Sequence, residues 1–255
     1  MALILNAVPN IPMIQPGDPL ADILFRALQQ AGITLEDQDI LVIAQKIVSK
    51  AEGRLVNLTE VTPSPQAVEL AGRTEKDPRF VELVLRESSA VLRSRPGTII
   101  VEHKKGFVCA NAGIDHSNVK GPWGNPEDWV LLLPADPDAS AERIRQEIEQ
   151  ASGAKIGVLI IDSHGRAWRN GIVGTTIGLA NVPGLVDMRG KPDMFGYRLR
   201  VTTIAAADEL AAAASLVMGQ ADECRPLVHV RGFPYPLREA HLQELIRPKE
   251  QDMFR

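Results

Sequence analysis

The sequence predicts an α+β, or irregular α/β, fold in which mixed sheets and helices form two intertwined regions. Short apolar runs such as residues 156–161 indicate strands buried on both faces, and apolar residues at helical spacing within 19–32 indicate a packed helix. Strands and helices do not alternate strictly, which argues against a regular βαβ sheet. The 255 residues, 45% hydrophobic and 24% charged, suit one large globular domain or two smaller ones.

The first part of the chain predicts a strand, a loop, a helix, a second strand and two more helices. Their expected ranges in this order are 3–8, 11–14, 19–32, 39–44, 65–74 and 78–93. We expect Asp18 to cap the first helix and Gly32 to end it, because short polar side chains favour helix starts and glycine favours left-handed helix ends. The polar residues after the second strand are expected to form a loop that ends at Gly53.

A change in composition follows Pro96 and Gly97. From there the chain predicts a hairpin, a strand, a helix, a buried strand, a glycine-rich bulged strand, a helix and a final strand. Their expected ranges in this order are 98–110, 130–133, 139–153, 156–162, 173–182, 208–219 and 227–232. Ser140 or Asp138 is expected to cap the helix over 139–153.

The charge balance and the cysteines exclude several classes of protein. Lys and Arg number 28 against 32 Asp and Glu, a net charge of −4 that lacks the positive field of a nucleic-acid binder. The two cysteines, Cys109 and Cys224, fit a reducing compartment and are both expected to be buried. No basic signal segment and no apolar run of about 20 residues occurs. We therefore expect a cytoplasmic protein with neither membrane nor nucleic-acid partners.

Asp162 and Ser163 follow a buried strand, at the kind of sheet edge where open sheets bind ligands. A carboxylate next to a hydroxyl resembles the oxygen pairs that hold Mg²⁺ or Mn²⁺ beside nucleotide phosphates. Arg166 and Arg169 add planar donors for phosphate or carboxylate, and we assign them to substrate binding. Alternatively, Asp162 only caps a turn and the arginines are solvated. Adjacent Asp162, Ser163 and His164 cannot stack as a hydrolase triad.

Two further segments carry candidate residues. Asp115 lies in a turn with Asn111 and Asn118, which is equally typical of a metal site and of an ordinary turn. Lys46, Ser49 and Lys50 would face Asp162 if their strands are neighbours, and otherwise are solvated residues at the end of a strand. No P-loop, Rossmann or zinc motif occurs, and most of the five histidines are expected at the surface.

Several long strings occur in a characteristic order over nearly the whole chain: QKIVSKAEGR, VLRES, GFVCANAGIDHSNV, LLLPADPDASAERIR, DSHGRAWRNGIVGTTIG, ADELAAAASLVMG and VRG. Together they closely resemble the coenzyme F420-0:L-glutamate ligase family in its single-domain form. The resemblance implies a homodimer with an unusual two-region α+β fold. It implies an enzyme that uses GTP, two divalent ions (Mg²⁺ or Mn²⁺) and K⁺ to add L-glutamate to the deazaflavin precursor of coenzyme F420.

The resemblance also implies the site residues. A nucleotide site is expected from Ile11, Pro12, Met13, Ile14, Gln45, Lys46, Lys50, Asn118, Met218, Gly219, Gln220, Ala221, Asp222 and Glu223. The implied metal ligands are Asp115, Asp162, Ser163 and Gln220, and the implied catalytic residues are Lys50, Asp115 and Asp162. Ser49 is assigned to substrate binding with the two arginines. Some relatives carry a glutamate where this chain has Gln220, so the second metal is expected to bind more weakly.

We expect residues 1–95 and 190–255 to form a larger nucleotide-binding region, and residues 96–189 a smaller one that carries the metal ligands. The implied reaction transfers the γ-phosphoryl group of GTP to the terminal carboxylate of the precursor and forms an acyl phosphate that glutamate attacks. The alternative is a non-catalytic homologue that binds a nucleotide or a deazaflavin, and the departure at Gln220 is its only support.

Overall fold

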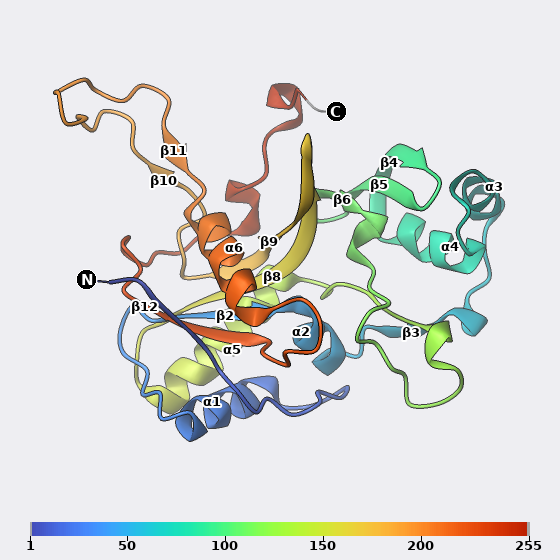
Figure 1. The fold of residues 1–255 in the computed structure, drawn as a ribbon, viewed down its shortest axis with the longest axis horizontal. Coiled ribbons are helices and arrows are strands. Elements are labelled where there is room, and N and C mark those ends of the chain that lie inside the picture. Colours follow the sequence, from blue (N-terminus) through green and yellow to red (C-terminus); the bar gives the residue numbers. More distant parts are fainter. Residues whose placement is uncertain (1, 254–255) are drawn as a thin grey trace.

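A five-stranded sheet forms the centre of the computed structural model, which describes residues 2–253 (Figure 1). Its strands, from one edge to the other, are β1 (Ile4–Ala7), β12 (Leu227–Arg231), β2 (Ile40–Ala44), β8 (Gly157–Arg166) and β9 (Arg169–Ala180). Strands β2 and β8 are parallel, whereas the other neighbouring pairs are antiparallel. The sheet is therefore mixed, and the predicted α+β class is confirmed.

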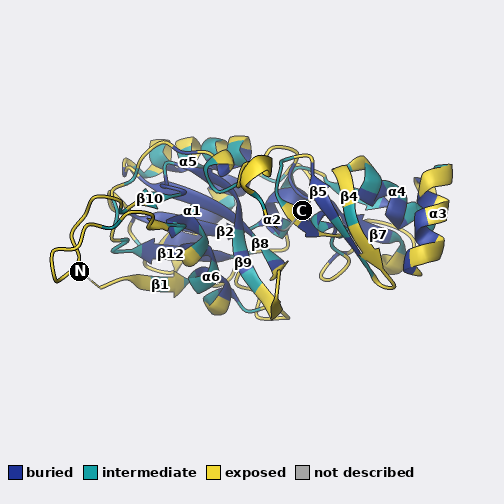
Figure 2. Ribbon diagram, turned by 90° about the horizontal axis from the view of Figure 1, so that it is seen from above, coloured by how far each residue is buried: buried dark blue, intermediate teal, exposed yellow. Residues whose placement is uncertain are grey.

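Helices cover both faces of this sheet, so its central strands are apolar on both sides. On β2, Leu41 and Ile43 pack into a core with α1 (Leu20–Gln30) and α5 (Pro137–Ser152). The alternate residues Ile40 and Val42 pack into a second core under α6, which spans Ala206–Met218. Figure 2 shows the buried strands between these two helical layers. Burial of both faces explains why the strands are continuous apolar runs.

A second region with its own core adjoins the sheet. Helices α3 (Pro65–Thr74) and α4 (Pro78–Arg86) pack with two small antiparallel sheets around a core that includes Val81, Val84, Ile99, Val101 and Val130. The first sheet contains β4 (Ser88–Arg95), β5 (Thr98–His103) and β6 (Val108–Ala110), and the second contains β3 (Leu55–Asn57) and β7 (Trp129–Leu131). Phe107 packs against this core and against both cores of the main sheet. It therefore lies where the two regions meet.

Sheet membership divides the chain at places other than the predicted boundaries. Strands β8 and β9 fall in the range assigned to the smaller region, 96–189, but they pair with β2 in the main sheet. Helices α3 and α4 fall in the range 1–95 but pack in the second region. The chain leaves the main sheet after α2 and returns through α5, and such long-range pairing leaves no local mark in the sequence.

The local predictions were wrong at several element ends. Residues after β2 form a helix, α2 (Gln45–Ala51), instead of a loop, and the helix expected over 78–93 ends at Arg86, where β4 follows. Asp18 does not cap α1: its side chain accepts a hydrogen bond from the Gln15 amide, and the N-cap residue of α1 is Pro19. Asp136 caps α5, because its side chain accepts a hydrogen bond from the Ala139 amide. A polar residue nearer the helix start thus caps α5, whereas α1 has no side-chain cap at all.

The remaining elements are short. Strands β10 (Val186–Asp187) and β11 (Thr203–Ile204) form the base of an arm that projects from the main sheet (Figure 1). Short 3₁₀ turns are η1 (Leu58–Glu60), η2 (Asn111–Gly113), η3 (Pro126–Asp128), η4 (Leu242–Glu244) and η5 (Lys249–Gln251). Within residues 2–253, no helix combines the length and the apolar character needed to span a bilayer.

We predict that Gly178→Ala destabilises the protein whereas Gly72→Ala does not. A Cβ on Gly178 of β9 would lie 2.5 Å from the Pro137 backbone at the start of α5. Such overpacking costs on the order of 1–3 kcal/mol. A Cβ on Gly72 of α3 meets no atom within 4 Å, and alanine there stabilises a helix by roughly 0.5–1 kcal/mol. Urea unfolding of both variants measures the difference, and equal stabilities would contradict the close approach of α5 to β9.

Candidate active site

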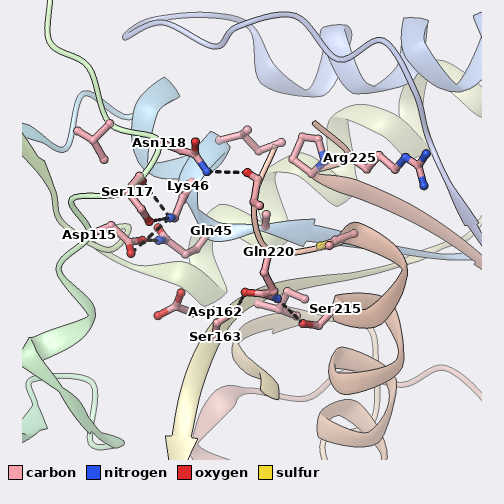
Figure 3. A pocket seen from close by; sticks show the side chains of 18 of the residues that line it. Gln45, Lys46, Asp115, Ser117, Asn118, Asp162, Ser163, Ser215, Gln220 and Arg225 are labelled. Carbon is pink, nitrogen blue, oxygen red and sulfur yellow. Dashed lines mark hydrogen bonds and ion pairs between the residues drawn. The ribbon is translucent and has the colours of Figure 1, made fainter. Parts of the chain in front are cut away.

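A cavity of 720 Å³ opens at the carboxyl ends of β2 and β8 (Figure 3). Its walls come from the loop 11–14, helix α2, the segment 110–120, the end of β8 and the segment 215–226. Every residue assigned to the nucleotide or to metal lies on these walls. Segments from the start, the middle and the end of the chain therefore meet in one place.

The parallel pairing of β2 with β8 explains how α2 and Asp162 come together. Ala44 at the end of β2 is the register partner of Ile161 on β8. The next residues, Gln45 and Asp162, therefore lie side by side, although β2 ends there and β8 continues to Arg166 paired with β9 alone. The condition stated for Lys46 and Lys50, that their strand neighbours the strand of Asp162, is therefore met, and both lysines line the cavity.

Asp115 reaches the cavity from the second region. Its main chain makes two hydrogen bonds of 2.9 Å with Leu131 at the end of β7. Its carboxylate accepts a 2.6 Å hydrogen bond from Gln45 Nε2 and lies 3.4 Å from Lys46 Nζ. Asn111 instead accepts a hydrogen bond from the Ile99 amide and lies off the cavity wall, so of the two readings left open for this segment Asn111 follows that of an ordinary turn.

Ser49 holds the side chain of Gln45 in one orientation. The Ser49 hydroxyl is fully buried and donates a 2.8 Å hydrogen bond to Gln45 Oε1. Because Ser49 donates to the oxygen of the Gln45 amide, the amide nitrogen Nε2 points toward Asp115. Ser49 lies on the side of α2 that faces the core and is absent from the cavity wall. Its assignment to substrate binding was therefore wrong.

The carboxylate of Asp162 influences that of Asp115. Burial, followed by repulsion from the Asp162 carboxylate, raises the pKa of Asp115 to about 6, and Lys46 opposes this shift. Burial and the nearby Lys46 ammonium lower the pKa of Lys50. The cavity thus holds like charges close together in a poorly hydrated place, which is typical of functional sites.

The lysines and Asn118 connect opposite walls of the cavity. Lys46 Nζ donates to the hydroxyl and the carbonyl of Ser117 at 2.8 and 3.1 Å, and Lys50 Nζ donates to the Asn118 carbonyl at 2.8 Å. Asn118 Nδ2 donates in turn to the carbonyl of Ala221 at 3.0 Å (Figure 3). The ammonium groups lie along this connection, where they can attract phosphate oxygens.

Gln220 is tied to the sheet edge by two serines. Its Oε1 accepts a 3.0 Å hydrogen bond from Ser163, and its Nε2 donates at 2.9 Å to Ser215 on α6 (Figure 3). Gln220 and Ser163 are therefore close enough to contribute to one binding site. A carboxylate at position 220 could accept from both hydroxyls, so the fold does not require the amide.

A buried histidine lies behind Asp162. His164 Nε2 is 3.1 Å from Asp162 Oδ2, and its ring packs against Phe107 at 5.5 Å. The expectation that most histidines are at the surface was wrong, since His103, His164 and His229 are buried. All three lie within strands, His103 in β5, His164 in β8 and His229 in β12.

Arg166 and Arg169, assigned to substrate, are exposed on the hairpin between β8 and β9 and do not line the cavity. Cys109 is buried, as expected, and burial raises the pKa of its thiol to about 12. Cys224 is exposed on the cavity wall, so the expectation of burial was wrong there. It occupies the irregular connection between α6 and β12, where no core is available.

Sequence reasoning missed Ser117 and Ser215. Ser117 lies between the predicted site residues Asp115 and Asn118, and this position could have indicated that it belongs to the site. Ser215 belongs to an alanine-rich helix and carried no signal, although it lies only five residues before Gln220, from which it accepts a hydrogen bond.

The donor set suits a hard cation. Asp115, Asp162 and Ser163 offer carboxylate and hydroxyl oxygens, the ligands that Mg²⁺ and Mn²⁺ accept. A cation beside them would relieve the repulsion that raises the pKa of Asp115. Among residues 2–253 no group of three or more His, Cys, Asp or Glu side chains could hold a metal ion alone. Phosphate or water oxygens would therefore have to complete its coordination.

Comparison with known proteins identifies the family. A family model described as F420-0:Gamma-glutamyl ligase matches residues 9–232. The chain belongs to the F420-0:gamma-glutamyl ligase family. The resemblance noted from the sequence strings is thus confirmed, and the cavity residues lie within the matched range.

Curated relatives of this ligase family extend over the full chain. The coenzyme F420:L-glutamate ligase of Methanothermobacter thermautotrophicus is 46% identical over 257 residues, which cover 100% of both chains. The protein of the same name from Methanopyrus kandleri is 44% identical over 98% of this chain and 97% of its own. That of Archaeoglobus fulgidus is 41% identical over 97% and 94%.

We predict that Asp115→Asn stabilises this ligase-family protein in the absence of metal and nucleotide, and only at higher pH. The raised pKa means that the contribution of Asp115 to stability is present below about pH 4 and is lost as the pH rises through about 6. At pH 8 the variant should be more stable by about 1–3 kcal/mol. Urea unfolding with a chelator at pH 4 and pH 8 measures this, and a stability difference independent of pH would contradict it.

Proposed function

We propose that this protein is a GTP-dependent ligase that adds L-glutamate to the terminal carboxylate of the coenzyme F420 precursor, F420-0, and then adds further γ-linked glutamates. One observation carries the proposal: in a chain of this family, Asp115 and Asp162 come from separate regions to one cavity that also contains Lys46 and Lys50. An acidic pair beside ammonium groups is the arrangement that positions phosphates and divalent ions.

The proposed reaction has two steps. A carboxylate oxygen of the precursor attacks the γ-phosphorus of GTP, so that GDP leaves and an acyl phosphate forms. The glutamate amine then attacks the acyl carbon, phosphate leaves, and the nitrogen loses a proton. Phosphorylation is needed because a free carboxylate is a poor electrophile. The protein mainly has to position the reactants and neutralise charge.

The walls of the cavity suit different parts of this reaction. The loop 11–14 and residues 218–223 supply the walls of the proposed nucleotide pocket, together with Gln45 and Asn118. Lys46 and Lys50 would hold phosphate oxygens once these replace the carbonyl groups that the lysines now contact. Gln45, fixed by Ser49, would keep Asp115 in place.

Asp115, Asp162 and Ser163 would hold the divalent ions, Mg²⁺ or Mn²⁺, with Gln220 as a neutral fourth ligand. The metal would supply positive charge that draws electron density from the phosphoryl group. K⁺ dependence and a homodimer are further parts of the proposal, carried over from the resemblance. Neither the contacts of Gln220 nor those of the lysines favour a non-catalytic binding protein over the ligase.

Product analysis tests the proposal directly. Purified protein is incubated with F420-0, L-glutamate, GTP and Mn²⁺, and the deazaflavin products are identified by mass spectrometry. We expect a mass increase of one glutamyl residue, or of several, and phosphate release that requires both F420-0 and glutamate. Nucleotide binding without glutamate-dependent phosphate release would favour the non-catalytic alternative.

We predict that Asp162→Asn abolishes ligation while the protein stays folded. The amide retains the size of the side chain but removes a charge from the proposed metal site. Asp115→Asn should behave alike, and the double variant should lose little more, because residues that serve one ion act as a unit. Steady-state rates together with melting curves measure this. Near-normal activity of Asp162→Asn at saturating Mn²⁺ would disprove the assignment.

We predict that GTP with Mn²⁺ raises the melting temperature more than ATP at the same concentration. A ligand that binds only the native state stabilises it by mass action, so the larger shift marks the tighter nucleotide. Lys50→Met should reduce the shift with either nucleotide, because Lys50 would contact phosphate and not the base. Differential scanning fluorimetry measures both effects, and equal shifts with GTP and ATP would count against a guanosine pocket.

A further inference from the structure

His164 lies two residues beyond Asp162, on the part of β8 that extends past the end of β2. Side chains alternate along a strand, so residues two apart point to the same face of the sheet. Both side chains line the cavity and are largely enclosed, with exposed fractions of 9% for His164 and 12% for Asp162. The imidazole is therefore part of the cavity wall beside the Asp162 carboxylate.

This imidazole holds one oxygen of the Asp162 carboxylate. His164 Nε2 lies 3.1 Å from Asp162 Oδ2, and an ionised carboxylate only accepts, so Nε2 carries a hydrogen and donates it. Within residues 2–253, Asp162 Oδ1 accepts no hydrogen bond. The contact thus engages one oxygen of Asp162 and leaves the other, on a carboxylate that lies near Asp115, for a cation (Figure 3).

Aromatic packing supports the His164 ring. It packs against Phe107 with the ring centroids 5.5 Å apart, and Phe107 in turn stacks on His103 of β5 at 4.8 Å, with 3° between the ring planes. Phe107 also packs against all three cores where the two regions meet. His164 is therefore supported from the second region as well as by its own strand, which gives its Nε2 a defined position relative to Asp162.

Packing alone does not require an imidazole at this position. A phenyl or aliphatic side chain could also cover Phe107, and it would not bring a polar nitrogen into a place with little water. Among the described residues, 2–253, the only hydrogen bond of the His164 ring is the one to Asp162. What distinguishes histidine from an apolar residue here is thus its contact with an acidic residue of the proposed metal site.

We propose that His164 is a positioning residue for the divalent ion: its Nε2–H holds Oδ2 of Asp162, so that Oδ1 is left to bind the ion. This inference rests on the proposed function, which assigns Asp162 to the metal. His164 is not itself a ligand, because the nitrogen that faces Asp162 carries a hydrogen and has no lone pair to offer. Hydrogen bonds of this kind orient metal-binding carboxylates, and their loss weakens metal binding by roughly 10- to 100-fold.

Mn²⁺ binding to three variants of His164 tests the inference, with free Mn²⁺ measured by electron paramagnetic resonance in the absence of nucleotide. His164→Met fills a similar space but cannot donate, and we expect it to weaken Mn²⁺ binding on the order of tenfold. His164→Gln places an amide nitrogen where Nε2 lies and should bind Mn²⁺ almost normally. His164→Asn carries the same amide on a shorter side chain that does not reach Asp162, so it should resemble the methionine variant.

Two comparisons separate positioning from a general loss of structure. In the Asp162→Asn background, His164→Met should weaken Mn²⁺ binding no further, because His164 acts only through that carboxylate. His229→Met is the matched control: His229 is also buried and its Nε2 lies 2.9 Å from Asp39 Oδ2, but this pair is absent from the cavity wall. The control should bind Mn²⁺ normally, and melting curves without metal record the stability of every variant.

The outcomes separate this inference from the proposed function. If the unmodified protein binds Mn²⁺ and His164→Met binds it equally well, the positioning role is wrong and the metal assignment of Asp162 stands. Equal weakening in His164→Met and His164→Gln would assign the ring to packing and also overturn the inference. If His164→Met does not fold, equal affinities of His164→Gln and His164→Asn would contradict the inference in its place. If the unmodified protein binds no Mn²⁺, the inference and the metal part of the proposed function are both wrong.

Discussion

The parallel pairing of β2 with β8 is the constraint on which the rest of the site depends. Because Ala44 and Ile161 are register partners, the helix that follows β2 and the carboxylate of the next β8 residue, Asp162, lie side by side where β2 ends. A slip of this pair by one residue would turn every side chain of β2 to the opposite core and separate the helix from Asp162. Burial on both faces holds the register, since Leu41 and Ile43 belong to one core and Ile40 and Val42 to the other. The large core around this sheet therefore also maintains the geometry of the cavity.

The second region completes the site by supplying Asp115 on a segment that is backbone-paired to β7. Its carboxylate meets Gln45 and Lys46 of α2, so a few polar contacts connect the region to the main sheet across the cavity. In this position the Asp115 carboxylate is buried near that of Asp162, and burial first and this repulsion second raise its pKa, although Lys46 and Gln45 oppose the shift. Such a site is least favourable when empty, and ligands that carry compensating charge should both fill it and hold the regions together. We regard the unfavourable free energy of burying Asp115 near Asp162 as the physical basis for metal and phosphate binding in the proposed reaction.

Local sequence signals predicted most elements and the fold class, but they failed where tertiary contacts decided the outcome. The apolar runs of β2 and β8 were clear because both faces of the central sheet are buried. The helix of Gln45–Ala51 was missed because three of its polar residues, Gln45, Lys46 and Lys50, face the cavity. The end of α4 was missed because β4 continues with similar residues. In the site, the residue types at Asp115, Asp162 and Lys46 indicated their chemistry. Their meeting could not be predicted without knowing that β2 neighbours β8, and the role of Ser49 required the buried side of α2.

The central claim is that Asp115 and Asp162 share one divalent ion, although they come from different regions. Mn²⁺ binding measures this directly, by the electron paramagnetic resonance signal of free Mn²⁺ in titrations of the unmodified protein and of Asp115→Asn, Asp162→Asn and the double variant. The account predicts one site that either single substitution weakens strongly and that the double substitution weakens no further. Unchanged Mn²⁺ affinity in either single variant, or losses of binding free energy that simply add, would show that the two carboxylates do not act on the same ion.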